Sequence, residues 1–368
     1  MKTVFGQNAF RHGVMSVGGA MATCALLVAC GGGGGSGTDT VSTPVTTFSP
    51  AIVGLAFDPI TQVLTVADVG GSVIRSVSVS TGATGIAAGS LYLTGSTDAT
   101  ASGARFNAPY GVARIGTDTY VADGSNNTIR KMSSAGVVTT LAGAPLAVGS
   151  ADGTGVAAGF YGPRGITTDG TDLYVADTGN QTVRKVTQGG VVTTVAGAVG
   201  LAGSANGIPG SAARFNNPFN LAVDQGSIYV TDTLNNSLRK IVLATGAVST
   251  VAGSNTSAAG SANGASGSAS SFNSPAGIAV VGGFGYVIDS GNALVRKVDL
   301  LTGATTTLAG QVGVTGLTDG MGAAAQFNKP YGVVSDGAGS LYVADGGNLK
   351  IRKIVLATGA VTTLPTTF

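Results

Sequence analysis

The sequence predicts an all-β fold, a six-bladed β-propeller of four-stranded antiparallel blades, and two observations support this prediction. First, the segment 160–197 recurs in six copies, which are spaced by 54 to 57 residues when they are aligned on one Asp. Second, each copy contains four short apolar runs separated by turn residues. A period of about 50 residues with four strands is typical of a propeller blade, and one blade cannot bury both its faces alone. Six blades are therefore expected to pack into a closed ring.

The four runs of one repeat are separated by residues that favour turns. In the third copy, residues 165–169 are followed by 173–177, an apolar run typical of a strand covered on both faces. Gly179 and Asn180 tolerate positive φ and predict a tight turn into the next run, 182–186. Residues 191–195 are all β-branched, as in an outer strand. No helical pattern is visible, and the predicted blades span residues 51–90, 106–144, 160–198, 215–254, 272–311 and 327–364.

Three polar residues recur at fixed positions. Each copy has an Asp, at Asp68, Asp123, Asp177, Asp232, Asp289 and Asp345, and an Arg seven residues later, at Arg75, Arg130, Arg184, Arg239, Arg296 and Arg352. An Asn follows the Asp at the third position, at Asn126, Asn180, Asn235, Asn292 and Asn348, whereas the first copy has Gly71. Across the hairpin the Arg lies diagonal to the Asp on the same face. We interpret the set as structural ion pairs with a turn-forming Asn; the alternative is a ring of six catalytic carboxylates.

The repeat resembles a known family. Phe-Asn-x-Pro-x-Gly is followed by Leu-Tyr-Val-Ala-Asp, an Asn, Arg-Lys and Gly-x-Val-x-Thr-x-Ala-Gly, which is similar to the NHL repeat of exported bacterial propellers. The resemblance covers residues 51–368 and implies a six-bladed propeller. It implies little about activity, because propellers carry unrelated functions. Enzymes among six-bladed relatives include amidating lyases with His-bound zinc and sugar lactonases whose metal uses a Glu, and some eukaryotic NHL propellers bind RNA through a basic face.

The first 50 residues predict export and attachment to a membrane. Lys2 and Arg11 precede an apolar stretch, so residues 1–29 are predicted to be a signal peptide. The segment 27–30, Leu-Val-Ala-Cys, resembles a lipoprotein cleavage motif, which implies lipidation of Cys30. The alternative is a transmembrane anchor, but the stretch is short for a span. Gly31 after the Cys implies an outer-membrane lipoprotein, if the source is Gram-negative.

Residues 30–50 are predicted to be a Gly/Ser/Thr-rich linker, and 51–368 the propeller. One β-prone piece of the linker, residues 45–48, is either a strand added to the last blade or a remnant of an inter-blade loop. The last blade already contains an outer run of its own, at residues 360–364. A strand exchanged between the two ends of the chain is therefore not required for closure.

Charge and composition exclude several functions. From residue 30 onward the chain has as many Lys and Arg as Asp, so it is nearly neutral and no nucleic-acid partner is expected. The only His is His12, there is no Glu, and the only Cys residues are Cys24 and Cys30. The mature chain therefore offers no imidazole ligand or base and no disulfide. We predict no cofactor and favour a non-enzymatic function.

The long loops between blades share one face with the Asp-x-x-Asn turns, and this face is the candidate binding surface. These loops carry weak candidates for calcium ligands, namely Asp98, Asp152 and Asp319, with Asn206 and Asn263 at equivalent places. The alternative is that these residues form Asx turns. We interpret Phe106, Phe160, Phe215, Phe272 and Phe327 as wedges between blades. Arg105, Tyr110, Arg164, Arg214, Lys329 and Tyr331 break the repeat without forming a recognisable site.

Together these features predict a monomeric, lipid-anchored envelope propeller, which acts as a binding or scaffold module for an unknown protein or glycan. The alternative is a metal-assisted lactonase-like or lyase-like enzyme, and a third hypothesis is a structural spacer without a ligand.

Overall fold

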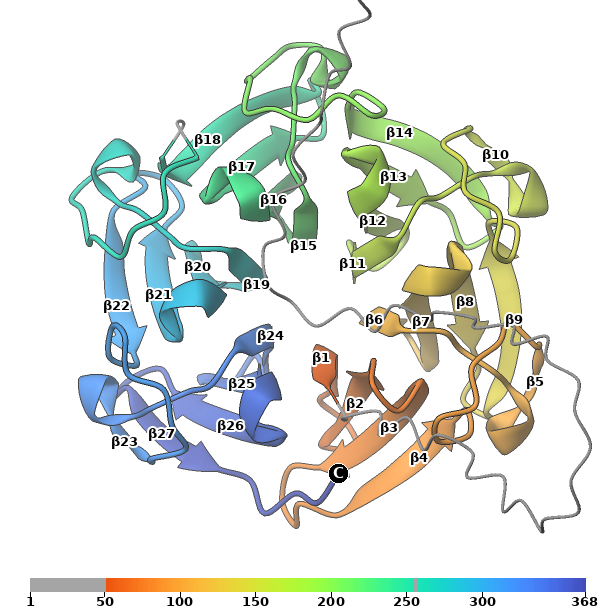
Figure 1. The fold of residues 1–368 in the computed structure, drawn as a ribbon, viewed down its shortest axis with the longest axis horizontal. Coiled ribbons are helices and arrows are strands. Elements are labelled where there is room, and N and C mark those ends of the chain that lie inside the picture. Colours follow the sequence, from red (N-terminus) through yellow and green to blue (C-terminus); the bar gives the residue numbers. More distant parts are fainter. Residues whose placement is uncertain (1–50, 255–256) are drawn as a thin grey trace, which may run out of the picture. The chain divides into compact units, whose positions relative to one another are not determined.

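The computed structural model describes residues 51–254 and 257–368, so the predicted signal peptide, Cys30 and the linker lie outside the described residues. The described chain forms six antiparallel sheets arranged radially around a central axis (Figure 1). The prediction of an all-β, six-bladed propeller is confirmed.

Each blade has four consecutive strands, from an inner strand beside the channel to an outer strand at the edge (Figure 1). The first three blades comprise β1 (Ile52–Asp58), β2 (Val63–Asp68), β3 (Val73–Ser78) and β4 (Thr84–Ala88); β6 (Pro109–Ile115), β7 (Asp118–Asp123), β8 (Thr128–Met132) and β9 (Val137–Ala142); and β11 (Pro163–Thr168), β12 (Leu173–Asp177), β13 (Thr182–Val186) and β14 (Val191–Gly197). The last three comprise β15 (Pro218–Asp224), β16 (Ser227–Asp232), β17 (Ser237–Val242) and β18 (Ala247–Gly253); β19 (Pro275–Val281), β20 (Phe284–Asp289), β21 (Leu294–Asp299) and β22 (Thr305–Ala309); and β24 (Pro330–Ser335), β25 (Ser340–Asp345), β26 (Lys350–Val355) and β27 (Ala360–Thr363).

Three blades carry a short fifth strand at the outer edge, in addition to the four strands that were predicted. The loops that enter these blades supply β5 (Ala99–Thr100), β10 (Gly153–Thr154) and β23 (Gly320–Met321), which pair with β9, β14 and β27. Single bridges, Gly207 to Val248 and Gly264 to Thr305, take the same place in the fourth and fifth blades. This pairing covers backbone groups that an edge strand would otherwise expose.

The turn after each second strand differs from the prediction. In the third blade it is a 3-10 helix, η4 (Thr178–Asn180), and the positive φ falls on Gln181, at 60°, instead of on Gly179 or Asn180. The equivalent turns are η2 (Gly124–Asn126), η6 (Thr233–Asn235), η8 (Ser290–Asn292) and η10 (Gly346–Asn348). The inter-blade loops contain η1 (Ala101–Gly103), η3 (Gly155–Ala157), η5 (Gly210–Ala212), η7 (Gly267–Ala269) and η9 (Gly322–Ala324).

Among residues 51–254 and 257–368 no helix has the length and apolar character needed to cross a membrane.

The hydrophobic core lies between neighbouring blades. Phe106 is fully buried and packs with Ala67 and Ile74 of the first blade and Val121 of the second. The structure confirms that these phenylalanines are wedges, because the same place at the next four joints is taken by Phe160, Phe215, Phe272 and Phe327. Burying such large side chains at five of the six joints holds neighbouring sheets together.

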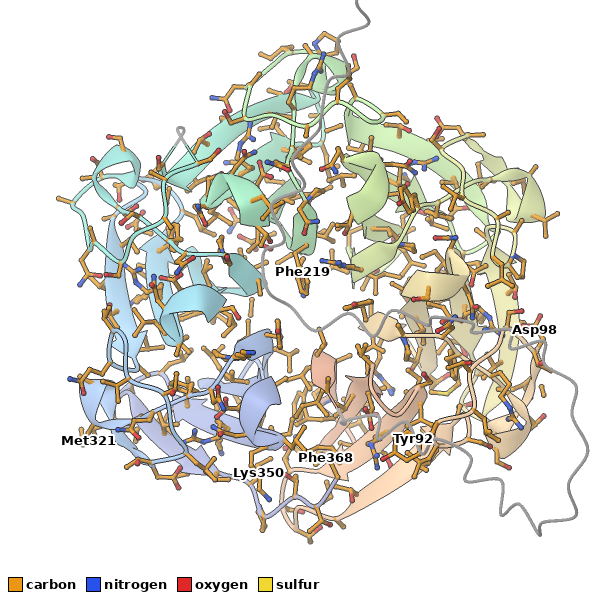
Figure 2. The ribbon with its side chains drawn as sticks, in the orientation of Figure 1. Tyr92, Asp98, Phe219, Met321, Lys350 and Phe368 are labelled. Atoms are coloured by element: carbon orange, nitrogen blue, oxygen red, sulfur yellow. The ribbon has the colours of Figure 1, made fainter. Side chains whose placement is uncertain are left out.

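Residues 364–368 close the ring against the first blade. The ring centroid of Phe368, which is labelled in Figure 2, lies 5.5 Å from the Arg75 guanidinium carbon. The equivalent Arg of every other blade lies 5.1 to 5.3 Å from its wedge Phe. Thr84 Oγ1 of the first blade donates a hydrogen bond to the Thr367 carbonyl at 2.8 Å. Phe368 therefore gives the first blade the contact with Arg that a wedge phenylalanine gives each of the others.

Candidate binding site at the mouth of the central channel

The repeated Asp, Asn and Arg side chains meet beneath each 3-10 turn. Asp177 Oδ2 accepts hydrogen bonds from Arg184 Nη1 and Asn180 Nδ2, both at 2.8 Å, while Oδ1 accepts one from the Tyr161 backbone N–H at 2.8 Å. Asn180 Nδ2 also donates to the Gly149 carbonyl at 2.7 Å. The second, fourth, fifth and sixth blades repeat the Asp–Arg and Asp–Asn bonds. In each of these blades, the hydrogen bonds of the Asp, Asn and Arg therefore connect the 3-10 turn to the loop that enters the blade.

The carboxylates of these sets are enclosed within the blades. The side chains of Asp177 and Arg184 are both fully buried. Burial raises the pKa of Asp177 to about 6, although hydrogen bonds from Asn180, Tyr161 N–H and Arg184 favour its ionised form. Burial has the same effect on the pKa of Asp123 and Asp232. Because both oxygens of Asp177 are bonded inside the blade, the arrangement is not an open ring of reactive carboxylates.

The three weak calcium candidates each contact an arginine. Asp152 Oδ1 accepts hydrogen bonds from Arg184 Nη2 at 2.8 Å and Thr194 Oγ1 at 2.9 Å. The same contacts are made by Asp98 and Asp319, and by Asn206 and Asn263 in the fourth and fifth blades. A guanidinium beside the oxygens disfavours a second cation there. Across the described residues, no three His, Cys, Asp or Glu side chains gather to hold a metal ion.

Six residues at one position of the repeat surround the mouth of the channel, and we call them the collar. This position follows the Pro that begins each inner strand, or Ile52 in the first blade, and the collar consists of Val53, Tyr110, Arg164, Phe219, Ala276 and Tyr331. The Arg164 guanidinium carbon lies 5.1 Å from the ring centroid of Tyr110 and 5.2 Å from that of Phe219. Phe219, which is labelled near the centre of the ring in Figure 2, stacks on Tyr331 with ring centroids 6.4 Å apart. The structure thus brings together three residues that the sequence had left unexplained: Tyr110, Arg164 and Tyr331.

The collar lies at the centre of the face that carries the 3-10 turns and inter-blade loops, which we call the rim. Each inner strand starts beside the turn that follows its second strand, since Pro163 pairs with Asp177. The other singular residues lie further out: Arg105 and Arg214 donate to backbone carbonyls of their own loops. Lys329 is exposed immediately before the inner strand of the sixth blade. The predicted binding surface therefore has a cationic, aromatic centre.

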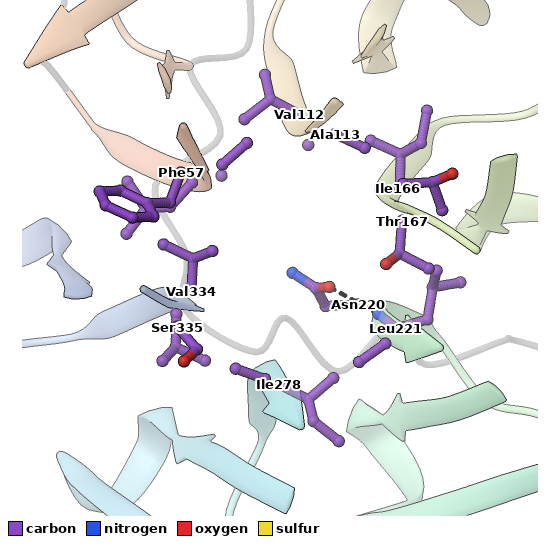
Figure 3. Close-up of a pocket in the computed structure, with 18 of the residues that line it drawn as sticks. Phe57, Val112, Ala113, Ile166, Thr167, Asn220, Leu221, Ile278, Val334 and Ser335 are labelled. Atoms are coloured by element: carbon purple, nitrogen blue, oxygen red, sulfur yellow. Dashed lines mark hydrogen bonds between the residues drawn. The ribbon is translucent and has the colours of Figure 1, made fainter. Parts of the chain in front are cut away.

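Below the collar, the inner strands line a cavity of about 310 Å³ (Figure 3). Five blades have Gly after the collar residue, and a Cβ at Gly165 would lie 2.6 Å from the Phe219 carbonyl oxygen of the next blade. The fourth blade has Asn220 instead, and its side chain reaches into the channel (Figure 3). There Thr231 Oγ1 donates to the Ala276 carbonyl of the fifth blade at 2.5 Å. At this position of the repeat, the channel thus carries one amide among five glycines.

Fold and site define this protein as a six-bladed β-propeller with a distinctive channel mouth. It has homologues among NHL repeat-containing proteins: human NHL repeat-containing protein 2 is 28% identical over 307 residues, which cover 74% of this chain and 42% of the human protein. Protein SUPPRESSOR OF QUENCHING 1, chloroplastic, from Arabidopsis thaliana is 28% identical over 276 residues, 70% of this chain and 26% of that protein. The chain thus spans less than half the length of these two relatives. No family model matches it.

Solved structures share the fold at low sequence identity. A structural genomics protein from Bacteroides thetaiotaomicron superposes with a TM-score of 0.63 at 21% identity, covering 85% of this chain and 70% of that one. An auxiliary nutrient binding protein from the same organism gives a TM-score of 0.61 at 15% identity, covering 85% and 69%. A catalytically inactive virginiamycin B lyase variant from Staphylococcus aureus gives 0.52 at 12% identity, covering 88% and 87%. These likenesses concern the fold alone.

Proposed function

We propose that this chain is a binding module of the bacterial cell envelope, which presents its rim to a protein or glycan. The collar carries this proposal. Most positions of the six repeats are explained by blade packing, whereas Tyr110, Arg164, Phe219 and Tyr331 place unlike large side chains at one repeat position around the channel mouth. Convergent polar and aromatic groups at a concave mouth are typical of ligand sites.

Composition favours binding over catalysis. Residues 31–368 contain no His, Glu or Cys, so a reaction here would have to use Asp, Lys, Arg or Tyr. Six repeated Asp residues bond to Arg within the blades. Assaying the purified chain for lactone hydrolysis with added Ca²⁺ or Mn²⁺ tests the enzymatic alternative, and metal-dependent turnover would contradict our proposal.

The proposed location depends on Cys30, at the end of the cleavage motif 27–30. Acyl chains on this residue would hold the propeller at the membrane, since more than one chain gives stable anchoring. We expect Cys30→Ala to release the protein from the membrane fraction and globomycin to block its processing. Unchanged processing and fractionation of the variant would reject the anchor.

Capture of a ligand tests the binding function. The full chain, purified in detergent, is immobilised and incubated with envelope extract, and the bound material is compared among variants. We expect Tyr110→Ala combined with Tyr331→Ala to lose a ligand that the unchanged chain and Leu301→Ala retain. Leu301 is a suitable control because its side chain is 94% exposed, between β21 and β22. Equal capture by all three proteins would overturn the proposal that the collar is the site.

A further inference from the structure

We propose that Arg164 binds the carboxylate of an acidic sugar, so that the ligand of the rim is a glycan containing uronic acid. This inference rests on the proposed binding function and specifies its ligand class. It follows from the bonding of Arg164, from the side chains around it and from the groups that remain exposed at the channel mouth.

Arg164 differs in its bonding from the other arginines in the described part of the chain. Seven of those form ion pairs with Asp, and Arg105 and Arg214 each donate to two backbone carbonyls. Within residues 51–254 and 257–368, Arg164 has no carboxylate within ion-pair distance, and its one hydrogen bond is to Asn217 Oδ1, at 3.3 Å. A guanidinium carries five N–H donors in a planar fork. Most donors of Arg164 are therefore available to a ligand.

The aromatic neighbours of Arg164 fix its position and leave it accessible. Tyr110 and Phe219 contact the guanidinium at 5.1 and 5.2 Å, and the Arg164 side chain is partly exposed. Holding a guanidinium in place reduces the entropy cost of binding a ligand. The planar fork matches a carboxylate, which accepts two parallel hydrogen bonds from it. Lys329, exposed on the same rim, adds positive charge that favours an anionic ligand.

The exposed groups favour a sugar over a peptide. Apolar collar residues are already packed, since Val53, Phe219 and Ala276 are 6%, 7% and 3% exposed. A peptide would have little apolar surface there in which to anchor a side chain. Beside the collar, the accessible groups are phenols and amides, including Tyr110, Tyr161, Asn217, Asn328 and Tyr331, whereas exposed aliphatic side chains of the rim, such as Leu146, Leu201 and Leu234, lie in the inter-blade loops and the turn η6. Phenol rings can contact the C–H face of a pyranose while hydroxyl and amide groups bond to its hydroxyls.

The test uses oligogalacturonate as the probe and isothermal titration of the full chain in detergent. We expect saturable binding that weakens at least about tenfold in Arg164→Gln, because the amide cannot replace the charge-assisted hydrogen bonds of the guanidinium. The matched control is Arg214→Gln, which alters another rim arginine whose Nη1 already donates to the carbonyls of Ser211 and Ala213. We expect this control to bind the probe as the unchanged chain does.

Two further probes identify the group that is recognised. Methyl-esterified oligogalacturonate keeps the sugar ring and removes the charge, so we expect it to bind as weakly as the charged probe binds Arg164→Gln. Equal binding of both oligomers, or no effect of Arg164→Gln, would overturn the inference. Tighter Arg164-dependent binding of a poly-aspartate peptide would replace the glycan by a peptide. If no oligogalacturonate binds while collar-dependent capture from envelope extract persists, the ligand class is wrong and the binding function stands.

Discussion

At the scale of single residues, the buried Arg is the most constrained side chain of each blade. Arg184 bonds to Asp177 and Asp152, donates to the Gly159 and Ala151 carbonyls, and lies 5.3 Å from the ring centroid of Phe160. One guanidinium thereby holds together the turn, the incoming loop and the wedge. Its contacts serve assembly of the blade, which explains why the residue recurs without any requirement for chemistry.

We expect Arg184→Met to destabilise the protein by about 3–5 kcal/mol, because it leaves the Asp177 carboxylate buried without its cation. Urea denaturation monitored by circular dichroism measures the change. The control is Lys185→Met, since Lys185 is partly exposed and paired with Asp172 at the surface; its effect should stay within about 1 kcal/mol. Similar losses in both variants would contradict the role given to Arg184.

The loop carboxylates give a pH-dependent prediction. Burial opposes ionisation of Asp152, but hydrogen bonds from Thr194 and Arg184 hold its pKa below 3.8. A pKa that is lower in the folded than in the unfolded protein stabilises the fold above about pH 4, and this contribution is lost as the pH falls through the folded pKa. We expect Asp152→Asn to lower the Tm by about 1–3 °C at pH 7 and by less at pH 3.

The fourth blade provides a natural comparison for this variant. Asn206 accepts hydrogen bonds from Arg239 Nη2 at 2.8 Å and Thr250 Oγ1 at 3.2 Å, so an amide can fill the position without loss of the blade. Calorimetry at the two pH values measures the difference, with Asp224→Asn as a control because Asp224 is a partly exposed residue at the end of β15 and does not belong to the Asp–Arg sets. If the Tm difference between Asp152→Asn and the unchanged protein grew as the pH fell, the lowered pKa of Asp152 would be contradicted.

At the scale of elements, neighbouring inner strands approach each other so closely that five of the six blades have Gly at the position after the collar residue. Gly165 of β11 faces β15, and a Cβ added to Gly165 would lie only 2.6 Å from the carbonyl oxygen of Phe219. We expect Gly165→Ala to cost about 1–3 kcal/mol through overpacking, as measured by chemical denaturation. The control is Gly189→Ala, where the nearest atom, Thr187 Oγ1, would lie 3.8 Å from the added Cβ. A stable Gly165→Ala protein would show that neighbouring inner strands can separate.

Much of the blade could be predicted from the sequence. The period and the apolar runs predicted the strands. The predicted diagonal placement of Arg184 and Asp177 is confirmed, because Val175 pairs with Arg184 and Asp177 pairs with Thr182. The position of positive φ in the turn was wrong, since Asn180 uses its side chain to bond Asp177 and Gly149 while Gln181 adopts the left-handed conformation. Turn residues predict a turn more reliably than the position of each φ within it.

The collar could not be recognised along the chain because its members lie one per repeat, about 55 residues apart, and only ring closure brings them together. The repeats nevertheless contain a signal. The collar position varies among Val, Tyr, Arg, Phe and Ala, whereas the residue before it is Pro in five copies and the residue after it is Gly in five copies. Aligning the six copies column by column therefore distinguishes this position from those that serve blade packing.

At the scale of the whole molecule, ring closure depends on residues outside the repeat. Residues 364–368 follow β27, and Phe368 stacks on Arg75 while the Thr366 carbonyl accepts a hydrogen bond from Lys350 Nζ. The sequence predicted six blades but contained no pattern for this segment, because a single aromatic residue beyond the last repeat has no counterpart to align with. The first blade thus obtains its aromatic contact from Phe368, which follows the last strand of the sixth blade.

We expect deletion of residues 364–368 to loosen the joint between the first and sixth blades. Hydrogen exchange should become faster in β3 and β4, because Arg75 and Thr84 lose their contacts with Phe368 and Thr367. Strands β12 and β13, at the far side of the ring, serve as the internal control. Protection that is unchanged in β3 and β4 would show that the ring closes without this segment. Phe368→Ala should also speed hydrogen exchange in β3 and β4, and should lower the free energy of unfolding by about 1–2 kcal/mol.

The bond from Thr84 to Thr367 joins residues that are 283 positions apart. Contacts of such long range form late, since most of the polypeptide must be in place before they can exist. A nascent chain that ends before residue 364 already contains the strands of all six sheets, but Arg75 still lacks its contact with Phe368. Synthesis of this protein therefore includes an interval, before residues 364–368 are added, in which the joint between the first and sixth blades lacks these contacts.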